Sequence, residues 1–247
     1  TSTGAPIVVD VTVKPLPVAT VTPASKTICS GTAFSVALNS NISGTSYNWT
    51  VVAPNIFGFS DGSGVTLPGQ TLTNSVSSAS TAVYTITPIA NTCMGSPITA
   101  TIIVNPTPTV IANPSSASIC SGETTNIALT SNVSGATFSW TVTSVDVSGA
   151  IAGNNTLIAQ TLFNSNLTLG SATYSIVPLA NSCSGAPVNV IVTVKPIPGI
   201  TATPSLQTIC SGTAPNIAFT SDLLCQSFSL FVKQSCLSGD SVGSGNT

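Results

Sequence analysis

Apolar and polar residues alternate along several short segments of the chain. Val188 to Val194 has a valine at every second position, and Ile98 to Val104 and Ile7 to Val13 also place Ile, Val or Ala at alternate positions. In a β-strand successive side chains point to opposite faces, so this period of two indicates strands with one buried face. Pro and Gly bound the segments, which are rich in Thr, Val and Ile. The pattern predicts an all-β protein with almost no helix.

The alternating segments recur because the sequence is a tandem repeat. The run Ile-Cys-Ser-Gly occurs three times, and its cysteines are Cys29, Cys120 and Cys210, which are 91 and 90 residues apart. Two pairs of aromatic residues have the same spacing: Trp49 with Trp140, and Tyr84 with Tyr174. A repeated unit of this length is a whole domain and not one turn of a solenoid. The chain is therefore predicted to be an array of similar modules.

Four segments follow from this alignment. Residues 1–16 match the last strand of a preceding module and could be a donor strand, 17–107 form module 1, 108–197 form module 2, and 198–247 form an incomplete module 3. Module 2 has predicted strands at Thr109–Ala112, Thr125–Ser131, Thr137–Thr143, Leu157–Phe163, Ala172–Val177 and Val188–Val194, with a possible short strand near Val147–Ala150. Six or seven strands in about 90 residues predict an immunoglobulin-like β-sandwich. We expect tandem sandwiches arranged as an elongated rod.

The two tryptophans and two of the tyrosines are predicted to be core residues. Apolar side chains lie two positions before and after Trp49 and Trp140, so each Trp shares a strand face with them. Tyr84 and Tyr174 alternate in the same way with Ile86 and Ile176. Aromatic side chains in such positions pack in a β-core more often than they form a ligand platform.

Charge is sparse, which excludes two classes of partner. Charged residues make up 4% of the chain, there is no Arg or His, and the net charge is −2. Such a chain has no positive electrostatic field that would attract nucleic acid or an anionic membrane. No apolar run approaches 18 residues, so membrane insertion is not expected either. Ser, Thr and Asn are left to form a polar surface, which is suited to carrying covalently attached glycans.

No catalytic or cofactor-binding constellation is present in the sequence. A Ser-His-Asp triad needs a histidine, and the acidic residues are scattered singly, so a paired-carboxylate site is not formed. Asp61-Gly62-Ser63-Gly64 offers one carboxylate, too few for calcium, and the cysteines lack the CxxC spacing of a zinc site. We therefore expect no enzyme activity, no cofactor and no metal.

The cysteines are predicted to pair within each module. Cys29 with Cys93 and Cys120 with Cys183 are 64 and 63 residues apart, and all four are expected in turns outside the strands. A disulfide closing such a loop would stabilise a module by about 4 kcal/mol in the chain-entropy model. The pairing requires four strands between the cysteines, because five would place them at opposite ends of the sandwich. Disulfides imply an oxidising, extracytoplasmic location.

The third copy departs from the pattern. It has Leu230 where the other copies have tryptophan, and it contains two additional cysteines, Cys225 and Cys236, which are 11 residues apart. These two cysteines could form a local hairpin disulfide or intermolecular cross-links.

Several short motifs together resemble one known family. They are Ile-Cys-Ser-Gly-Thr at residue 28, and Phe-Ser-Trp-Thr-Val, Ala-Thr-Tyr-Ser-Ile, Asn-Ser-Cys-Ser-Gly-Ala-Pro and Val-Thr-Val-Lys-Pro, beginning at residues 138, 172, 181 and 192. The chain resembles the PKD-like, immunoglobulin-like repeats of large secreted surface proteins of Bacteroidetes-type bacteria, described as gliding-associated or adhesin-like. The resemblance implies an extracellular or cell-surface module without catalytic residues. Asp240-Ser241-Val242 similarly resembles the O-glycosylation signal of such proteins and makes Ser241 a candidate sugar site.

Two functions and two readings of the termini remain open. The array is expected to be the structural part of an extracellular filament, fibre or stalk; the alternative is an adhesin whose loops bind glycans or cell-surface proteins, with Phe57 and Phe59 as candidates. The incomplete end modules indicate either a window of a longer array or end-to-end assembly of copies, in which Ile7 to Val13 completes the third module of a neighbour. Against donation, a segment equivalent to Leu157 to Ser182 would still be missing from the hybrid module.

Overall fold

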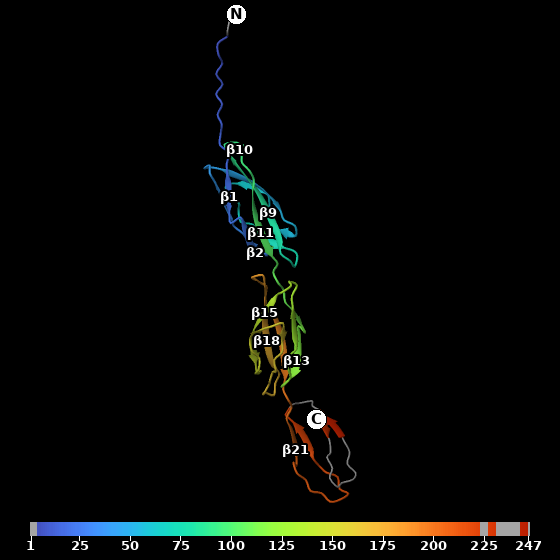
Figure 1. Cartoon of the computed structure of the whole chain (residues 1–247). Helices are drawn as coiled ribbons and strands as arrows, with labels where there is room; N and C mark the ends of the chain where they lie inside the picture. The colour runs from blue at the N-terminus through green and yellow to red at the C-terminus, as the bar shows by residue number, and fades with distance from the viewer. Residues whose placement is uncertain (1–3, 223–226, 231–242, 247) are drawn as a thin grey trace. The chain divides into compact units, whose positions relative to one another are not determined.

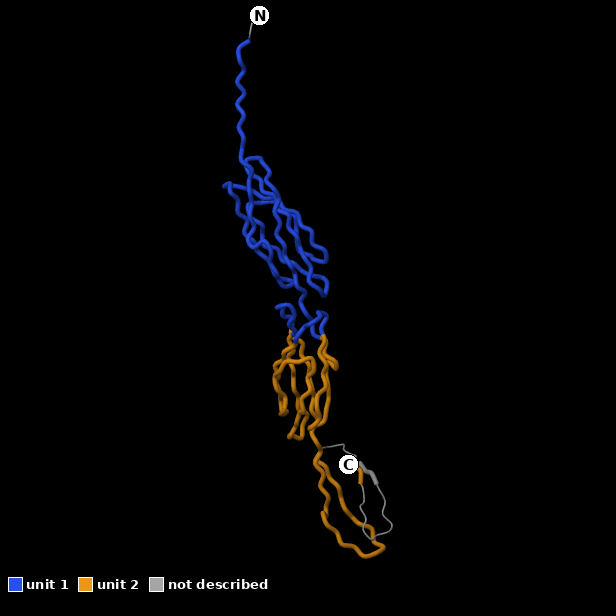
Figure 2. Tube along the Cα trace, viewed as in Figure 1, with its two compact units in different colours: residues 1–110, 131–137, 178–186 blue, residues 111–130, 138–177, 187–247 orange. Residues whose placement is uncertain are grey.

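The computed structural model describes residues 4–222, 227–230 and 243–246, and every helix or strand element in these ranges is a β-strand (Figure 1). The chain divides into two compact units (Figure 2). Unit 1 comprises residues 1–110, 131–137 and 178–186, and unit 2 comprises residues 111–130, 138–177 and 187–247. The boundaries of the units differ from those of the sequence copies, because unit 1 includes two loops of the second copy.

The strands of the first copy are β1 (Ala19–Thr22), β2 (Ser25–Cys29), β3 (Thr32–Ala33), β4 (Ala37–Ser40), β5 (Ser46–Val52), β6 (Ile56–Phe57), β7 (Gly62–Gly64), β8 (Thr71–Asn74), β9 (Ser80–Ala90), β10 (Cys93–Met94) and β11 (Ile98–Asn105). Those of the second copy are β12 (Ile111–Asn113), β13 (Ser116–Cys120), β14 (Ile127–Thr130), β15 (Thr137–Val145), β16 (Gly153–Asn154), β17 (Leu157–Ile158), β18 (Gly170–Ala180), β19 (Cys183–Ser184) and β20 (Val188–Lys195). The third copy has β21 (Ile200–Thr203), β22 (Ala218–Ser221), β23 (Ser227–Leu230) and β24 (Gly243–Asn246).

Both complete copies build the same pair of layers. The larger sheet has the order β2-β11-β9-β5-β7 in the first copy and β13-β20-β18-β15-β16 in the second, with β10 and β19 attached to β9 and β18. The opposing layer contains β1-β4 and β3-β8-β6 in the first copy and β12-β14-β17 in the second. In the first copy all of these pairs are antiparallel except β2 with β11, and in the second copy the equivalent pair, β13 with β20, is likewise parallel. This architecture is the predicted tandem immunoglobulin-like β-sandwich.

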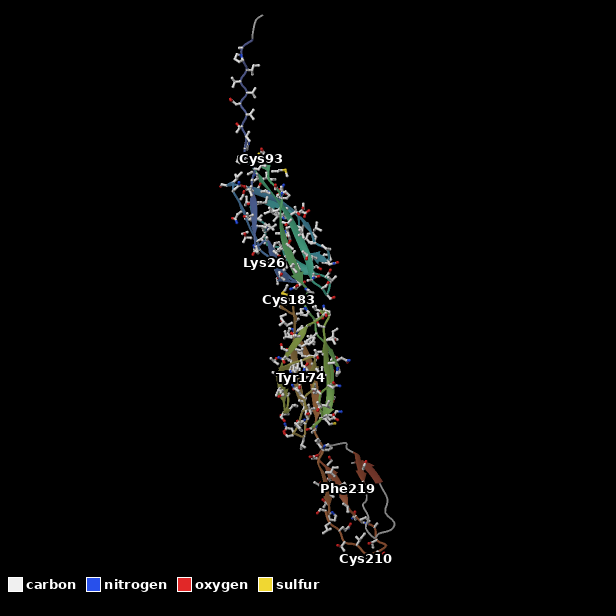
Figure 3. All side chains as sticks on the ribbon, viewed as in Figure 1. Lys26, Cys93, Tyr174, Cys183, Cys210 and Phe219 are labelled. Carbon is white, nitrogen blue, oxygen red and sulfur yellow. A yellow bond between two sulfur atoms is a disulfide. The ribbon has the colours of Figure 1, made fainter. Side chains whose placement is uncertain are left out.

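The core lies between the two layers and follows the alternation in the sequence. Along β9 and β18 every second side chain is buried. Tyr84 and Tyr174 have no exposed surface, and Trp49 and Trp140 are also buried. Figure 3 shows Tyr174 on its strand in the second copy. The aromatic landmarks are therefore core residues in both copies.

Each copy contains one strand, β2 or β13, that the sequence does not predict. β2 and β13 pair with the last strand of their copies, in segments that were expected to be turns. Pro23 and Pro114 precede them and separate them from β1 and β12, which pair in the opposing layer. A proline lacks the N–H needed for a ladder, so the chain leaves one sheet there and joins the other. The predicted strand Leu157–Phe163 is also shorter, because only Leu157–Ile158 forms a strand and isolated bridges follow at Thr161 and Phe163.

A network of hydrogen bonds joins the buried aromatic side chains in each core. The indole N–H of Trp49 donates to the carbonyl of Ser60 (3.2 Å), Gln70 Nε2 donates to the same oxygen (3.1 Å), and the Tyr84 hydroxyl donates to Gln70 Oε1 (2.8 Å). The second copy repeats the arrangement with Trp140, Ile151, Gln160 and Tyr174 at 2.8–3.1 Å. Because a buried donor without a partner is costly, this network gives each aromatic side chain one preferred position.

Gly62 lies directly under the indole of Trp49 and should not tolerate a side chain. A Cβ at this position would be 2.7 Å from Cζ2 of Trp49, whereas a Cβ at Gly64 on the same strand would meet its nearest atom at 3.4 Å. We expect Gly62→Ala to lower the free energy of unfolding by about 1–3 kcal/mol through overpacking. Gly64→Ala is the matched control and should change it by less than about 0.5 kcal/mol. Urea denaturation of the two variants compares them directly; equal effects would contradict the steric explanation.

The buried tyrosines should make the modules sensitive to alkali. Burial raises the pKa of Tyr84 and of Tyr174 from 10.0 to about 12. The folded state therefore keeps its proton while the unfolded state loses it, so the stability contribution is complete below pH 10 and is lost as the pH rises through 12. The slope is at most about 1.4 kcal/mol per pH unit for each tyrosine. Denaturation midpoints from pH 9 to 12 should fall less steeply for the second copy in Tyr174→Phe; an unchanged slope would rule out this tyrosine as the cause.

Candidate functional site

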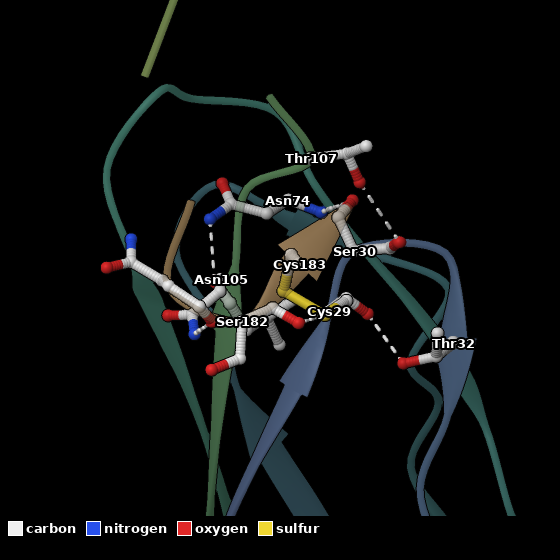
Figure 4. Close-up of a disulfide and its surroundings, with 10 residues drawn as sticks. Cys29, Ser30, Thr32, Asn74, Asn105, Thr107, Ser182 and Cys183 are labelled. Carbon is white, nitrogen blue, oxygen red and sulfur yellow. Dashed lines mark hydrogen bonds between the residues drawn. A yellow bond between two sulfur atoms is a disulfide. The ribbon is translucent and has the colours of Figure 1, made fainter. Parts of the chain in front are cut away.

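Cys29 and Cys183 form a disulfide, with their Cα atoms 5.6 Å apart (Figure 4). Both residues belong to unit 1, although Cys29 comes from the first sequence copy and Cys183 from the second. The predicted pairs Cys29–Cys93 and Cys120–Cys183 are therefore wrong. The disulfide joins one copy of the repeat to the next.

The paired strands explain why cysteines of the same copy do not meet. Cys29 follows Ile28, which lies beside Val104, and Val104 pairs in turn with Ser80 at the start of β9. Cys93 pairs with Ala90 at the other end of β9. Eleven strand residues span about 34 Å, far beyond the 7 Å limit for a disulfide. The two cysteines lie at opposite ends of the sandwich, the condition under which the predicted pairing fails.

The turn after β2 holds Cys29 in place through its neighbours. The N–H of Ser30 donates to the carbonyl of Asn105 (2.8 Å), and the Ser30 hydroxyl accepts from the N–H of Asn74 (2.9 Å). The Thr32 hydroxyl donates to the Cys29 carbonyl at 2.6 Å. Gly31 has a φ of 81°, a conformation that glycine adopts without steric cost. The Ile-Cys-Ser-Gly-Thr motif is therefore a tight turn that presents a cysteine at the end of a strand.

Cys183 is presented by the hairpin between β18 and β19. Asn181 and Ser182, at the hairpin tip, have φ values of 49° and 63°. Cys183 is only 1% exposed, and the Sγ of Cys29 lies 3.9 Å from the Ser182 carbonyl oxygen. Asn105 also contacts the hairpin, because its side-chain amide donates to the Asn181 carbonyl at 3.1 Å. The disulfide is thus accompanied by a hydrogen bond from the segment that joins the two copies.

The segment that leads into the second copy crosses this hairpin at Pro108. A Cβ at Gly185 would be 1.9 Å from the carbonyl oxygen of Pro108, so only glycine leaves room for the chain crossing. The hairpin of the first copy repeats the geometry: a Cβ at Gly95 would be 1.9 Å from the carbonyl oxygen of Pro17. Both hairpins are therefore packed against the proline-rich segment that enters their copy.

Cys93 and Cys120, which are predicted to form disulfides, are not paired in the described residues. Cys93 is partly exposed, and Cys120 and Cys210 are exposed, all as free thiols. Cys225, Cys236 and the candidate glycosylation residue Ser241 lie outside the described residues. Sequence reasoning missed the Cys29–Cys183 link because it compared cysteines only within a copy. The signal that could have found it is the strand before each Ile-Cys-Ser-Gly turn.

Among residues 4–222, 227–230 and 243–246, no three His, Cys, Asp or Glu side chains come close enough together to hold a metal ion. No helix in this described part of the chain is long and apolar enough to cross a membrane.

The repeated layers define a class of protein: tandem immunoglobulin-like β-sandwiches. A family model for the PKD-like domain matches the chain twice, at residues 26–108 and 117–198. The chain therefore belongs to the PKD-like domain family. No curated protein matches it.

Solved structures that match this chain include modules of other proteins. The fibronectin(III)-like modules of Clostridium thermocellum CbhA share 15% identity, with 72% of this chain and 95% of that one covered and a TM-score of 0.27. Human CDH23 EC21-23 shares 16% identity, with 86% and 84% covered and a TM-score of 0.36. Human mucin-like protocadherin EC1-2 shares 10% identity, with 73% and 99% covered and a TM-score of 0.31.

Proposed function

We propose that this chain is the structural repeat region of an extracellular bacterial filament, fibre or surface stalk, without catalytic activity. The observation that carries the proposal is the disulfide between Cys29 and Cys183, which ties consecutive copies of the repeat together in addition to the main chain. A second covalent connection limits the independent motion of neighbouring copies. A spacer requires this restriction, whereas an enzyme active site does not. PKD-like modules in tandem suit this role.

The proposed location is the cell surface or the extracellular space, after secretion. A disulfide persists in oxidising compartments, and PKD-like modules fit such a setting. The gliding-associated and adhesin-like surface proteins of Bacteroidetes-type bacteria are the proposed context. With charged residues at 4% of the chain, the surface depends on Ser, Thr and Asn for hydration. We therefore include covalently attached glycans in the proposal, with Ser241 as one candidate.

The joints between copies favour a spacer over a flexible string. Asn105-Pro106-Thr107-Pro108 contains two prolines, and proline restricts φ to a narrow range. Asn105 donates to Asn181, and the Thr107 hydroxyl donates to the Ser30 carbonyl at 3.4 Å. The segment between copies is therefore fixed by its own hydrogen bonds in unit 1, next to the disulfide.

An adhesin is the second candidate, and one observation favours it. Phe57 lies in β6 of the first copy and is 62% exposed, and Phe59 is also exposed. An exposed aromatic ring can stack on a sugar or on an apolar side chain of a partner protein. The second copy has Ser148 and Ala150 at the equivalent positions, so a binding surface of this kind would belong to the first copy alone.

Electron cryo-microscopy of the native material tests the structural role. The expected result is a filament with an axial repeat that corresponds to the module length, and density beyond Ser, Thr or Asn side chains where glycans are attached. Isolated, flexible molecules without a filament would reject the filament and favour the adhesin. In that case glycan-array binding should be strong and should be lost in Phe57→Ala, with Val52→Ala, an exposed apolar residue of β5, as the matched control.

A further inference from the structure

We propose that Asn41 and Asn132 are acceptor sites for N-linked glycans, at the same turn of the two complete copies. The sequences Asn41-Ile42-Ser43 and Asn132-Val133-Ser134 occupy equivalent positions of the repeat. Asn-x-Ser/Thr, with any residue except proline at x, is the acceptor signal for N-glycosylation. The inference rests on the proposed glycosylated, extracellular role, and it assigns part of that glycan to two named side chains.

Both tripeptides lie in a surface turn, which connects β4 to β5 in the first copy and β14 to β15 in the second. Asn41 and Asn132 are exposed, as are the serines two positions after them. Gly44 and Gly135 follow with φ values of 77° and 73°, which glycine adopts without steric cost. Val133, the middle residue of the second tripeptide, is buried and anchors its turn. The acceptor signal is therefore accessible in turns of one shape.

Each turn holds its asparagine by the side-chain carbonyl oxygen. Oδ1 of Asn41 accepts from the N–H of Val18 at 2.7 Å, and Oδ1 of Asn132 accepts from the N–H of Thr109 at 2.8 Å. A backbone N–H can only donate, so the atom that faces it must be the amide oxygen and not the amide nitrogen. The contact therefore fixes which end of each amide is used by the fold.

The amide nitrogen of each asparagine is left without a structural role. Within the described part of the chain, every side-chain hydrogen bond of Asn41 and Asn132 is made through Oδ1, and none is made by Nδ2. N-glycosylation bonds the sugar to Nδ2 and leaves Oδ1 as a carbonyl. A glycan can therefore be attached while the hydrogen bond that holds the turn stays in place.

The third copy shows that the fold requires only the oxygen at this position. Asp222 is the equivalent residue, and its Oδ1 accepts from the N–H of Gly199 at 2.7 Å. A carboxylate therefore makes the same main-chain contact as the two asparagine amides. The third copy also has Leu224 in place of the serine, so it lacks both parts of the acceptor signal. The turn itself explains neither the amide nitrogen nor the serine of the first two copies.

Three further Asn-x-Ser/Thr sequences have different surroundings. Asn48 lies in β5 between two paired strands, and Asn154 lies in β16, which pairs with β15. Pairing keeps both in extended strands, whereas an acceptor is typically in a surface loop. Asn166 is in a loop, but the first copy has Val76 in its place. The signal that both complete copies share is the one in the turn.

The modification is the transfer of an oligosaccharide from a lipid-linked oligosaccharide diphosphate by an oligosaccharyltransferase. Nδ2 of the asparagine forms a bond to the anomeric carbon of the first sugar, and the bond from that carbon to the diphosphate oxygen breaks. Nδ2 gives up one proton, and the lipid diphosphate leaves with the electron pair of the broken bond. The transfer therefore needs no oxidant or reductant.

Glycopeptide mass spectrometry of the native secreted chain tests the two sites. The chain is reduced, alkylated and digested with chymotrypsin, and electron-transfer fragmentation then assigns each sugar to a residue. We expect sugar on Asn41 and on Asn132, and none on Asn48, which has the same signal within a strand. Native protein with Asn41 and Asn132 both unmodified, or with sugar on Asn48 in their place, would overturn the inference.

Variants of the first copy, expressed in the native cells, identify the attached atom. Asn41→Asp copies the residue of the third copy, so it should remove the sugar and leave the denaturation midpoint of the deglycosylated protein unchanged. Ser43→Ala should also remove the sugar, although Asn41 is intact, because it destroys the signal. Ser43→Thr is the matched control and should keep the sugar. Sugar that persists in Asn41→Asp would place it on another residue and overturn the assignment.

Failure of this inference is distinguishable from failure of the proposed function. Filaments built from chains without sugar on Asn41 and Asn132 would reject the two sites and leave the structural role in place. Chains that carry sugar on both residues but form no filament would support the sites and reject the filament.

Discussion

Chemical cleavage after Met94 should leave the two parts of the chain joined until the disulfide is reduced. Met94 is the single methionine, so cyanogen bromide divides the chain into residues 1–94 and 95–247. Cys29 lies in the first fragment and Cys183 in the second, and their bond holds the fragments together. If cysteines paired within each copy, the fragments would separate at once. Denaturing electrophoresis with and without reductant, after alkylation of free thiols, distinguishes the two pairings.

Two cysteine variants serve as controls for this cleavage. Cys183→Ser should release both fragments without reductant, because it removes the bond between them. Cys93→Ser should behave like the unaltered chain, since Cys93 is a free thiol in the monomer. Release of the fragments from unaltered protein in the absence of reductant would contradict the observed pairing.

Trp140→Ala should remove a large part of the stability of the second copy. Trp140 is buried, and its indole N–H donates to the Ile151 carbonyl at 3.1 Å. Truncating a buried Trp to Ala costs about 3–5 kcal/mol, whereas a domain of this size is stable by about 5–13 kcal/mol in total. Hydrogen exchange followed by mass spectrometry should show faster exchange along β18 and β20 of the second copy.

The same measurement contains its own control, because the first copy has an equivalent core. Exchange along β9 and β11 should stay unchanged in Trp140→Ala, and Trp49→Ala should produce the converse result. Trp140→Phe should have a smaller effect than Trp140→Ala, since it keeps most of the buried area. Equal acceleration in both copies would mean that the two cores unfold as one cooperative unit.

The strand faces and the core were predictable from the sequence because one face of each strand is buried. Alternation along Val188 to Val194 reports that burial, and the structure buries Val190, Val192 and Val194. The repeat added the module size, because equivalent residues such as Trp49 and Trp140 must occupy equivalent places. Local pattern and spacing are sufficient where each residue's environment depends on its own copy.

The disulfide could not be predicted in the same way. Its pairing depends on which end of the sandwich each cysteine occupies, and this depends on β2, a strand of alternating Ser, Lys, Thr and Ile that gives a weak apolar signal. If β2 is not recognised, Cys29 is assigned to a turn. Nothing then indicates at which end of the sandwich that turn lies. The Pro23 break before it conceals the change of sheet, since proline also marks ordinary turns. A comparison of residues within one copy cannot identify contacts between copies.

The disulfide also determines how a pulling force would travel along the chain. Tension applied at the two termini passes from Cys29 directly to Cys183 through the sulfur atoms, which are 154 positions apart in sequence. The residues between them form a closed loop that this tension cannot extend while the bond is intact. Most strands of the first copy and β12–β18 of the second lie inside this loop. Stretching would therefore leave most of both cores intact for as long as the sulfur–sulfur bond survives.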